Sequence, residues 1–289
     1  MASLSLLNDL LFKIVFGQEQ SSEPLRSLIN ALLALEGPER IVELEILNPY
    51  GSKQHLLDKD VILDVKARDG RKRLFNVEVQ MAPQPAYVER ALYYLARLFS
   101  SQLVPGVSYT QLTRTIGISL LDFELFPEAE ALHSRFRLHD QQHGRELTDV
   151  FELHFIELAK FRREAPEDLR TPFERWLNLL RYSELYGSGE RPVPEVLIQE
   201  EGIEMALNSM RRASASAEVR ELIEMWEKAG HDVATRIEAA EQKGRQEERL
   251  QTARRMREAG MATEQILQFT GLSAEDLQAF SPPGDVKRR

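Results

Sequence analysis

The sequence predicts an α+β fold, in which a mixed β-sheet flanked by helices is followed by a helical C-terminal region. Three observations support this prediction. The chain opens with amphipathic helical spacing, several short strand-like segments follow up to about residue 160, and no strand-like segment occurs over 165–277. Because the helical and strand segments alternate without a regular βαβ rhythm, we expect a mixed sheet rather than a purely parallel one.

Length and composition indicate a globular protein with more than one part. The 289 residues exceed the usual size of one core, so we expect a domain over 1–160, a helical extension over 161–245 and a C-terminal helical segment with a frayed tail over 246–289. The 43% hydrophobic content excludes wholesale disorder. The absence of cysteine excludes disulfides and thiolate zinc sites, and the six histidines show no paired ligand spacing, so any metal must bind oxygen ligands.

The first seventeen residues begin as an apolar segment. Asp9 and Lys13 interrupt this segment before a signal-peptide core or a membrane span of about 20 residues could form. We therefore predict a cytoplasmic location and no membrane contact.

Periodicity places the remaining elements. Helices are predicted over 6–15, from about Pro24 to the Gly37-Pro38 stop, and over 87–103, and further strands over 41–47, 115–126, 135–138 and 151–158. The charged stretch 241–257 predicts either an exposed helix or a flexible connector.

The strongest local signal is a β-hairpin over residues 60–80, turning at Asp69-Gly70. A two-residue loop would leave Glu78 on the opposite face of the sheet from Asp64. A three-residue loop, with Gly70 in a left-handed bulge, changes the parity by one and brings Asp64, Glu78 and Gln80 to one face. We predict the bulged hairpin.

On that face, two carboxylates from neighbouring strands would form a hard oxygen site suited to Mg²⁺ or another divalent cation. Such an ion can polarise a phosphodiester and help generate the attacking hydroxide. Gln80 or Lys66 could position the water or meet the developing charge. The alternate residues, which fall on the other face, are apolar and predict burial against helices: Leu63, Val65, Val77 and Val79.

The order hydrophobic-Asp-hydrophobic, turn, hydrophobic-Glu-x-Gln resembles the PD-(D/E)xK nuclease superfamily, in the variant where Gln replaces the lysine. Four segments in this order resemble the Rpn family of recombination-promoting, transposase-like nucleases: residues 8–16 (NDLLFKIVF), 63–66 (LDVK), 76–80 (NVEVQ) and 90–94 (RALYY). The resemblance covers roughly residues 5–160, and the segment 253–276 also resembles tails in that family.

The resemblance implies a metal-dependent DNA endonuclease linked to recombination or mobile DNA. Asp64 and Glu78 would be its metal ligands, and Gln80 would stand where the superfamily's lysine acts. Because Gln carries no charge, water activation would depend on the metal or on Lys66. Asp9 matches the acid of the family's N-terminal helix, where it either supports the site or interacts with a helix end or with Lys13 four residues on.

A local excess of basic residues suits a DNA substrate. The net charge of −9 argues against a protein that coats nucleic acid, but nine basic and six acidic residues fall within 51–100. Tyr87, Arg90, Tyr94 and Arg97 share one helix stripe, which predicts either DNA contact by Arg90, Tyr94 and Arg97 or packing of the rings on the sheet.

Two short helices divided by Gly271 are predicted over 263–280, with Ser273 capping the second. They could form a helix-turn-helix, but the second carries two acids and no Arg or Lys, which favours packing or dimerisation. Cutting both strands of DNA usually needs two sites, so a homodimer is expected. The alternatives to a nuclease are a catalytically inactive relative that binds DNA or protein, and a regulatory or structural protein that assembles through its helical half.

Overall fold

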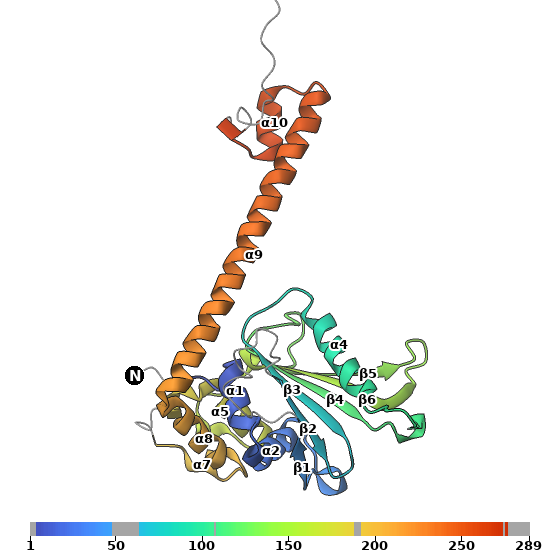
Figure 1. Cartoon of the computed structure of the whole chain (residues 1–289), viewed down its shortest axis with the longest axis vertical. Coiled ribbons are helices and arrows are strands. Elements are labelled where there is room, and N and C mark those ends of the chain that lie inside the picture. The colour runs from blue at the N-terminus through green and yellow to red at the C-terminus, as the bar shows by residue number, and fades with distance from the viewer. Residues whose placement is uncertain (1–3, 48–63, 107, 188–191, 274, 277–289) are drawn as a thin grey trace, which may run out of the picture. The chain divides into compact units, whose positions relative to one another are not determined.

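The computed structural model describes residues 4–47, 64–106, 108–187, 192–273 and 275–276 (Figure 1). The chain divides into two compact units, Met1–Arg220 and Glu221–Arg289, which are described separately. Within the described residues, no helix has both the length and the apolar character needed to cross a membrane.

The first unit contains one six-stranded sheet, and the predicted mixed architecture is confirmed. Its strand order is β1-β2-β3-β4-β6-β5. The β1-β2, β2-β3 and β5-β6 pairs are antiparallel, whereas β3-β4 and β4-β6 are parallel. The strands are β1 (Leu44–Ile46), β2 (Val65–Asp69), β3 (Leu74–Gln80), β4 (Thr115–Leu121), β5 (His133–His139) and β6 (Glu146–Glu157).

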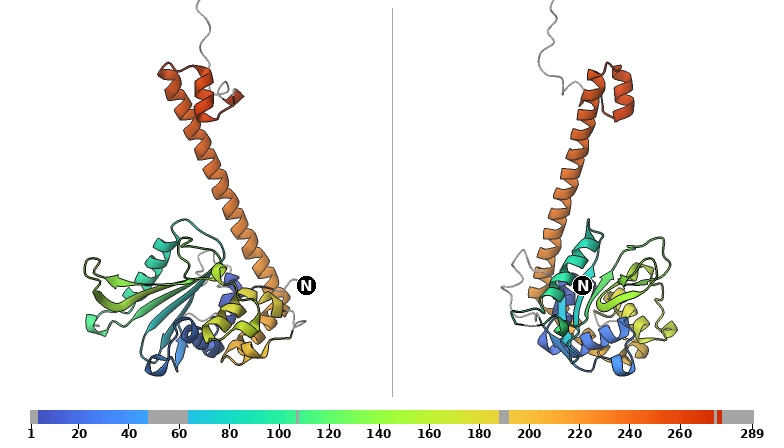
Figure 2. Two further views of the ribbon diagram at one scale, coloured as in Figure 1. Left: turned by 180° about the vertical axis from the view of Figure 1, so that it is seen from behind. Right: turned by 90° about the vertical axis from the view of Figure 1, so that its right-hand side faces the viewer.

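Helices cover the sheet in the first unit. Helix α4 lies along one face, and the helices α1, α2, α5, α7 and α8 gather on the other side (Figures 1 and 2). The helices of this unit are α1 (Asp9–Phe16), α2 (Ser22–Leu32), α4 (Tyr87–Ser100), α5 (Pro172–Tyr182), α6 (Glu184–Gly187), α7 (Glu195–Ile198) and α8 (Ile203–Ala215). Short 3-10 helices span Glu19–Ser21, Gly37–Glu39, Tyr109–Gln111, Leu158–Lys160 and Pro166–Asp168.

Helix α1 begins three residues after the predicted start at residue 6 and ends at Phe16, one residue beyond the predicted end. Asn8 caps it, because its Oδ1 accepts a hydrogen bond from the Leu11 N–H at 3.0 Å. The Gly17 N–H donates to the Lys13 carbonyl at 2.8 Å, where the helix stops. Seven of its eight residues are buried, and Phe16 packs against Trp176 of α5 at a ring-centre distance of 5.9 Å. This short helix is therefore held firmly inside the helical layer.

The other face of the sheet approaches α4 closely at Gly117 of β4. A Cβ built at Gly117 would lie 2.9 Å from Cδ2 of Leu153 and 3.5 Å from Cδ1 of Leu95. Only a residue without a side chain lets Leu95 of α4 and Leu153 of β6 meet over this strand. The apolar cluster that results also contains Tyr87 and Phe155.

The β2-β3 hairpin turns through the three residues Gly70–Lys72. The Asp69 N–H donates to the Arg73 carbonyl at 3.1 Å and the Lys72 N–H to the Asp69 carbonyl at 2.9 Å. The predicted three-residue loop is thus confirmed, but the left-handed residue is Lys72, with φ of 65°, rather than Gly70. A tight turn followed by a left-handed third residue is the usual form of such loops.

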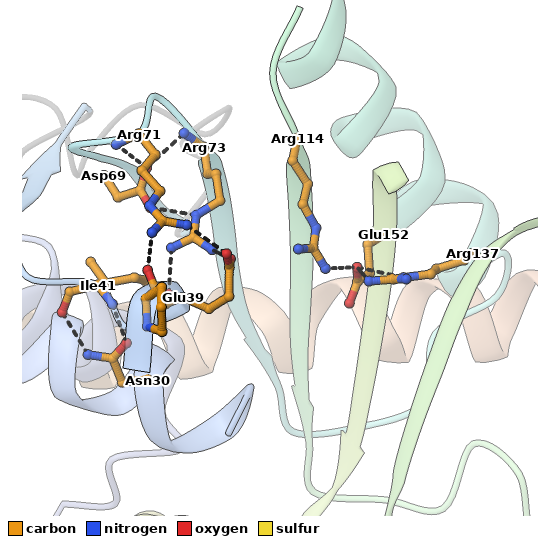
Figure 3. Close-up of polar contacts among 10 residues, drawn as sticks. Asn30, Glu39, Ile41, Asp69, Arg71, Arg73, Arg114, Arg137 and Glu152 are labelled. Atoms are coloured by element: carbon orange, nitrogen blue, oxygen red, sulfur yellow. Dashed lines mark hydrogen bonds and ion pairs between the residues drawn. The ribbon is translucent and has the colours of Figure 1, made fainter. Parts of the chain in front are cut away.

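The side chain of Asp69 explains why the turn starts there. Its Oδ1 accepts the N–H groups of Arg71 and Arg73 at 3.0 and 2.8 Å, and its Oδ2 accepts Nε of Arg73 at 2.6 Å. Arg73 also bonds Oε2 of Glu39 at 2.8 Å (Figure 3). The sequence predicted the left-handed residue at Gly70, but the hydrogen bonds that Asp69 accepts place it at Lys72.

Three strands are joined by a buried ion-pair network on the face opposite α4. Glu152 of β6 is 2% exposed and accepts hydrogen bonds from Arg114, the residue before β4, and from Arg137 of β5 (Figure 3). Arg135 of β5 also donates to this carboxylate. His154 bonds the same carboxylate at 2.6 Å. Three guanidinium groups around one carboxylate satisfy a charge that would otherwise be costly to bury.

The second unit is helical and consists of the larger part of α9 (Ala217–Glu258) together with α10 (Thr263–Thr270). The charged stretch 241–257 is helical rather than a flexible connector. Ala253, Ile266 and Leu272 form the buried centre of a small core. Gly271, with φ of 66°, ends α10, and Ser273 exchanges hydrogen bonds with Asp276 as predicted. The predicted helix end over 277–280 and the frayed tail lie outside the described residues.

Candidate active site

The hairpin brings Asp64, Glu78 and Gln80 to one face of the sheet. Asp64 directly precedes β2, and Val65 pairs with Val77, so extending this register by one residue places Asp64 opposite Glu78. Directly opposed residues of antiparallel strands have Cα atoms about 4.5–5.5 Å apart. Asp64 is 3% exposed, and Gln80 follows two residues after Glu78 on the same face.

The reverse face of this hairpin is apolar, as predicted. Val65, Val77 and Val79 are all buried. Leu63 lies outside the described residues. The carboxylates are therefore backed by a packed layer that fixes the strands carrying them.

Groups from two other elements orient Glu78. Its Oε1 accepts hydrogen bonds from the Tyr87 hydroxyl of α4 at 2.7 Å and from Oγ of Ser119 of β4 at 3.1 Å. Both bonds go to one oxygen, so neither engages Oε2. Burial raises the pKa of Glu78, and the charge of Asp64 adds to this, while the bonds from Tyr87 and Ser119 and the charge of Arg90 oppose it.

Tyr87 is adapted to donate to a carboxylate. Burial, followed by the charge of Glu78, raises the pKa of the Tyr87 phenol, so its proton stays on the oxygen. Helical spacing placed Tyr87 on the α4 stripe but did not predict this role, and Ser119 was not among the predicted site residues. The available signal was a hydroxyl residue in the middle of the otherwise apolar segment Ile116–Leu121.

Two lysines contact Asp64. The Nζ of Lys66 lies 3.3 Å from its Oδ2, and the Nζ of Lys13 donates to its main-chain carbonyl at 2.5 Å. Lys13 is 5% exposed. Burial lowers the pKa of Lys13 to about 8, with Lys66 contributing and Asp64 opposing. Lys13 was not among the predicted site residues, although a cation among the apolar residues of this helix is a recognisable signal.

Asp9 reaches the same site from α1. Burial raises the pKa of Asp9 to about 6, the charge of Glu78 adds to the increase, and the charge of Arg90 opposes it. Its Oδ1 is buried and has no hydrogen-bond partner among the described residues. Lys13, the alternative partner considered from the sequence, instead directs its ammonium to Asp64. These observations favour the site role of Asp9 over a purely local one.

The amide of Gln80 is held at both ends. Its Oε1 accepts a hydrogen bond from Nη2 of Arg90 at 2.6 Å, and its Nε2 donates to the Ala82 carbonyl at 3.0 Å. Arg90 comes from α4 and also bonds Oε1 of Gln84. The Gln80 side chain is thus part of a fixed contact with Arg90.

The remaining residues of the predicted α4 stripe lie further along the helix. Arg97 is exposed, and its Cζ lies 5.8 Å from the ring centre of Tyr93 rather than over Tyr94. Tyr93 is 59% exposed, whereas Tyr94 is half-buried. Tyr93, which the predicted stripe did not include, therefore forms part of the exposed aromatic surface of α4.

The carboxylates are hard oxygen donors. Within the part of the chain that the structure describes, no group of three or more His, Cys, Asp or Glu side chains is arranged to hold a metal ion. A cation here would therefore depend on two carboxylates completed by water and substrate oxygens. Mg²⁺ is commonly bound in this way.

Comparison with known families identifies both parts of the chain. Residues 6–240 match the family described as PD-(D/E)XK nuclease family transposase, and residues 246–282 match the C-terminal HTH domain of the Rpn/YhgA-like nuclease family. No curated protein and no solved structure matches the chain.

The second match corrects one interpretation. The acidic second helix counted against a helix-turn-helix in the sequence, and that inference is wrong. It weighed the charge of one short helix, whereas the motif is defined by how small helices pack around a tight turn. Here Ala253, Ile266 and Leu272 supply that packing. The predicted resemblance to Rpn nucleases is confirmed: the chain belongs to the PD-(D/E)XK nuclease family of transposases and carries the C-terminal HTH domain of Rpn/YhgA-like nucleases.

Proposed function

We propose that the protein is a Mg²⁺-dependent DNA endonuclease that hydrolyses phosphodiester bonds, with a role in recombination or mobile DNA. Membership of the family supports a nuclease-like function related to mobile DNA, and its nucleases generally use divalent metals. The observation that carries the proposal is the register that sets Asp64 opposite Glu78. Two strands would not need buried carboxylates facing each other if they were only scaffold.

The residues present fit a divalent cation. Asp64 and Glu78 would hold the ion, and Asp9, whose buried Oδ1 lacks a hydrogen-bond partner in the described part of the chain, would support it through water. Acidic groups that raise one another's pKa are stabilised when a cation is added. The bound ion would supply Lewis-acid stabilisation of the phosphate and a lowered pKa of its water.

The chain's own residues have separable tasks in this proposal. Tyr87 and Ser119 fix the orientation of Glu78 by bonding one of its oxygens. Lys66 offsets the charge of Asp64 and lies where it can meet a phosphate oxygen or position the attacking water. Gln80 accepts a hydrogen bond from Arg90 and so holds this guanidinium at the edge of the site.

We further propose that DNA is bound by two surfaces. Arg90, Tyr94 and Arg97 of α4, joined by the exposed ring of Tyr93, would contact the backbone and bases near the cut, and the C-terminal HTH domain would provide a second contact. A homodimer would supply two sites for cutting both strands. Light scattering of the free and DNA-bound protein tests this stoichiometry.

Plasmid cleavage tests the activity. Purified wild-type protein should nick or linearise plasmid with Mg²⁺ and lose this activity in EDTA. Asp64→Asn keeps the shape of the side chain but removes the ligand charge, so it should reduce cleavage at least about a hundredfold, the size of effect expected when a main electrostatic contributor is lost. Asp149→Asn, at an exposed position of β6, is the matched control and should cleave normally.

The outcomes separate the competing functions. Cleavage that persists in EDTA or in Asp64→Asn would overturn the proposed chemistry. DNA binding without any cleavage under all metal conditions would instead support the inactive binding module. Neither result would be explained by misfolding if circular dichroism and thermal unfolding of Asp64→Asn match those of Asp149→Asn.

A further inference from the structure

Arg90 occupies an unusual electrostatic position beside the carboxylates. Its guanidinium is held by the amide oxygens of Gln80 and Gln84, and its Cζ lies 5.2 Å from the ring centre of Tyr87. All three of these groups are uncharged at neutral pH. Among the described residues, no carboxylate oxygen lies within 4 Å of its nitrogens.

Arginines in or next to the strands of the sheet differ from Arg90 in this respect. Arg73, Arg114 and Arg137 each form an ion pair with a carboxylate. Arg90 is half-buried, yet its charge reaches both Asp9 and Glu78 and lowers the pKa of each. The positive charge therefore acts on the site without a direct carboxylate partner among the residues that the structure describes.

Gln80 is oriented to hold this charge. Because its Nε2 donates to the Ala82 carbonyl at 3.0 Å, its Oε1 must face the other way, toward Nη2 of Arg90. A lysine at position 80 would place an ammonium against the guanidinium. The neutral amide thus allows the Arg90 guanidinium to approach β3 from α4, at the position where the superfamily's lysine would stand.

We propose that Arg90 is the phosphate-binding cation of this active site, with Gln80 as its positioning residue. The inference rests on the proposed nuclease function. Arg90 stays protonated throughout, so it transfers no proton. In hydrolysis, the attacking water gives up one proton to solvent as its oxygen bonds to phosphorus, the bond to the leaving ester oxygen breaks, and that oxygen takes up one proton from solvent. The Nη groups of Arg90 would meet the charge that grows on the non-bridging oxygens.

A salt titration tests the phosphate contact without any cleavage. The affinity of the full-length protein for a short DNA duplex is measured with Ca²⁺ in place of Mg²⁺, between about 50 and 200 mM salt. Loss of one phosphate contact in Arg90→Ala should reduce the slope of log K against log salt by about 0.9. Arg145→Ala, which removes an exposed arginine at the turn of the β5-β6 hairpin, should leave the slope unchanged. An unchanged slope in Arg90→Ala would overturn the proposal.

A relocated charge tests the catalytic part. Arg90→Ala should lower kcat in Mg²⁺ by about 10²–10³-fold, as for loss of one donor to a developing oxyanion. In the double variant Arg90→Ala with Gln80→Lys, the ammonium should restore at least tenfold of this loss. A role limited to folding would show no such rescue.

The outcomes also distinguish this inference from the nuclease proposal. A reduced slope with no cleavage by any variant would keep Arg90 as a phosphate contact and reject the nuclease. Cleavage that is dependent on Asp64 but equal in Arg90→Ala and wild type would keep the nuclease and reject the catalytic role of Arg90.

Discussion

Replacing Asp9 by Asn is expected to stabilise the metal-free protein at pH 8. The pKa of Asp9 is raised from 3.8 to about 6, mainly by burial and then by Glu78. A carboxyl whose pKa is higher in the folded state contributes stability below its unfolded pKa and loses it as the pH rises through the folded pKa. The difference of about two pH units, at 1.36 kcal/mol each, corresponds to at most about 3 kcal/mol above pH 6.

The measurement is urea unfolding of wild type and Asp9→Asn in EDTA at several pH values from 4 to 8. The free energy of unfolding of wild type should fall relative to that of the variant as the pH rises from about 4 to about 6, and the difference should then remain constant. Asp149→Asn, at an exposed position, should differ from wild type by less than about 0.5 kcal/mol at every pH. Equal stability of Asp9→Asn and wild type at pH 8 would refute the argument that burial and Glu78 destabilise the Asp9 carboxylate.

Three further predictions concern the site and its supports. Mg²⁺ should raise the melting temperature of wild type, and Glu78→Gln should abolish the increase, because the ion would bind the folded site alone; a calorimetric scan with and without EDTA measures this. Gly117→Ala should cost about 1–3 kcal/mol in urea unfolding by crowding Leu153, and Leu153→Val should recover part of it; equal stability would mean that the sheet and α4 can move apart freely. Glu152→Gln should cost about 3–5 kcal/mol, because three arginines around it lose their shared carboxylate, and a smaller loss at pH 7 would show that water replaces it.

Glu152 also predicts how stability responds to acid. Burial alone would raise its pKa, but hydrogen bonds from His154 and Arg114 lower it to about 2. A depressed carboxyl pKa contributes stability above the unfolded value of 4.5 and loses it as the pH falls toward the folded value. Wild type should therefore lose stability between about pH 4.5 and 2, and Glu152→Gln should lose less over the same range, as acid unfolding followed by circular dichroism would show.

Most of the sheet could be predicted from the sequence because strand alternation reports burial on one face. The segments around Leu44–Ile46, Leu74–Gln80 and Thr115–Leu121 were all recognised as strands. The left-handed position of the hairpin was not, because it depends on where the Asp69 side chain accepts its hydrogen bonds. The helix-turn-helix was likewise not predicted, because this motif is defined by the packing of its helices and not by the acidic charge of the second helix.

The carboxylate pair could be predicted because residue order and loop parity determine it. The groups that orient it come from segments distant in sequence: Tyr87 from α4, Ser119 from β4 and Lys13 from α1. Spacing within one segment carries no information about which residue of another segment will meet it. The pairing of Arg90 with Gln80 was missed for the same reason, since it needs the packing angle of α4 on the sheet.

The three-residue loop Gly70–Lys72 limits how this hairpin can change in length. Adding or deleting one residue there would keep both strands and their apolar content, yet it would rotate Glu78 toward the helical layer and bring a valine of β3 opposite Asp64. A length change of two residues would return Glu78 to the face of the sheet that carries Asp64. Insertions that preserve this site are therefore expected to come in even numbers, and a chain with an odd change would keep a stable sheet while losing its paired acids.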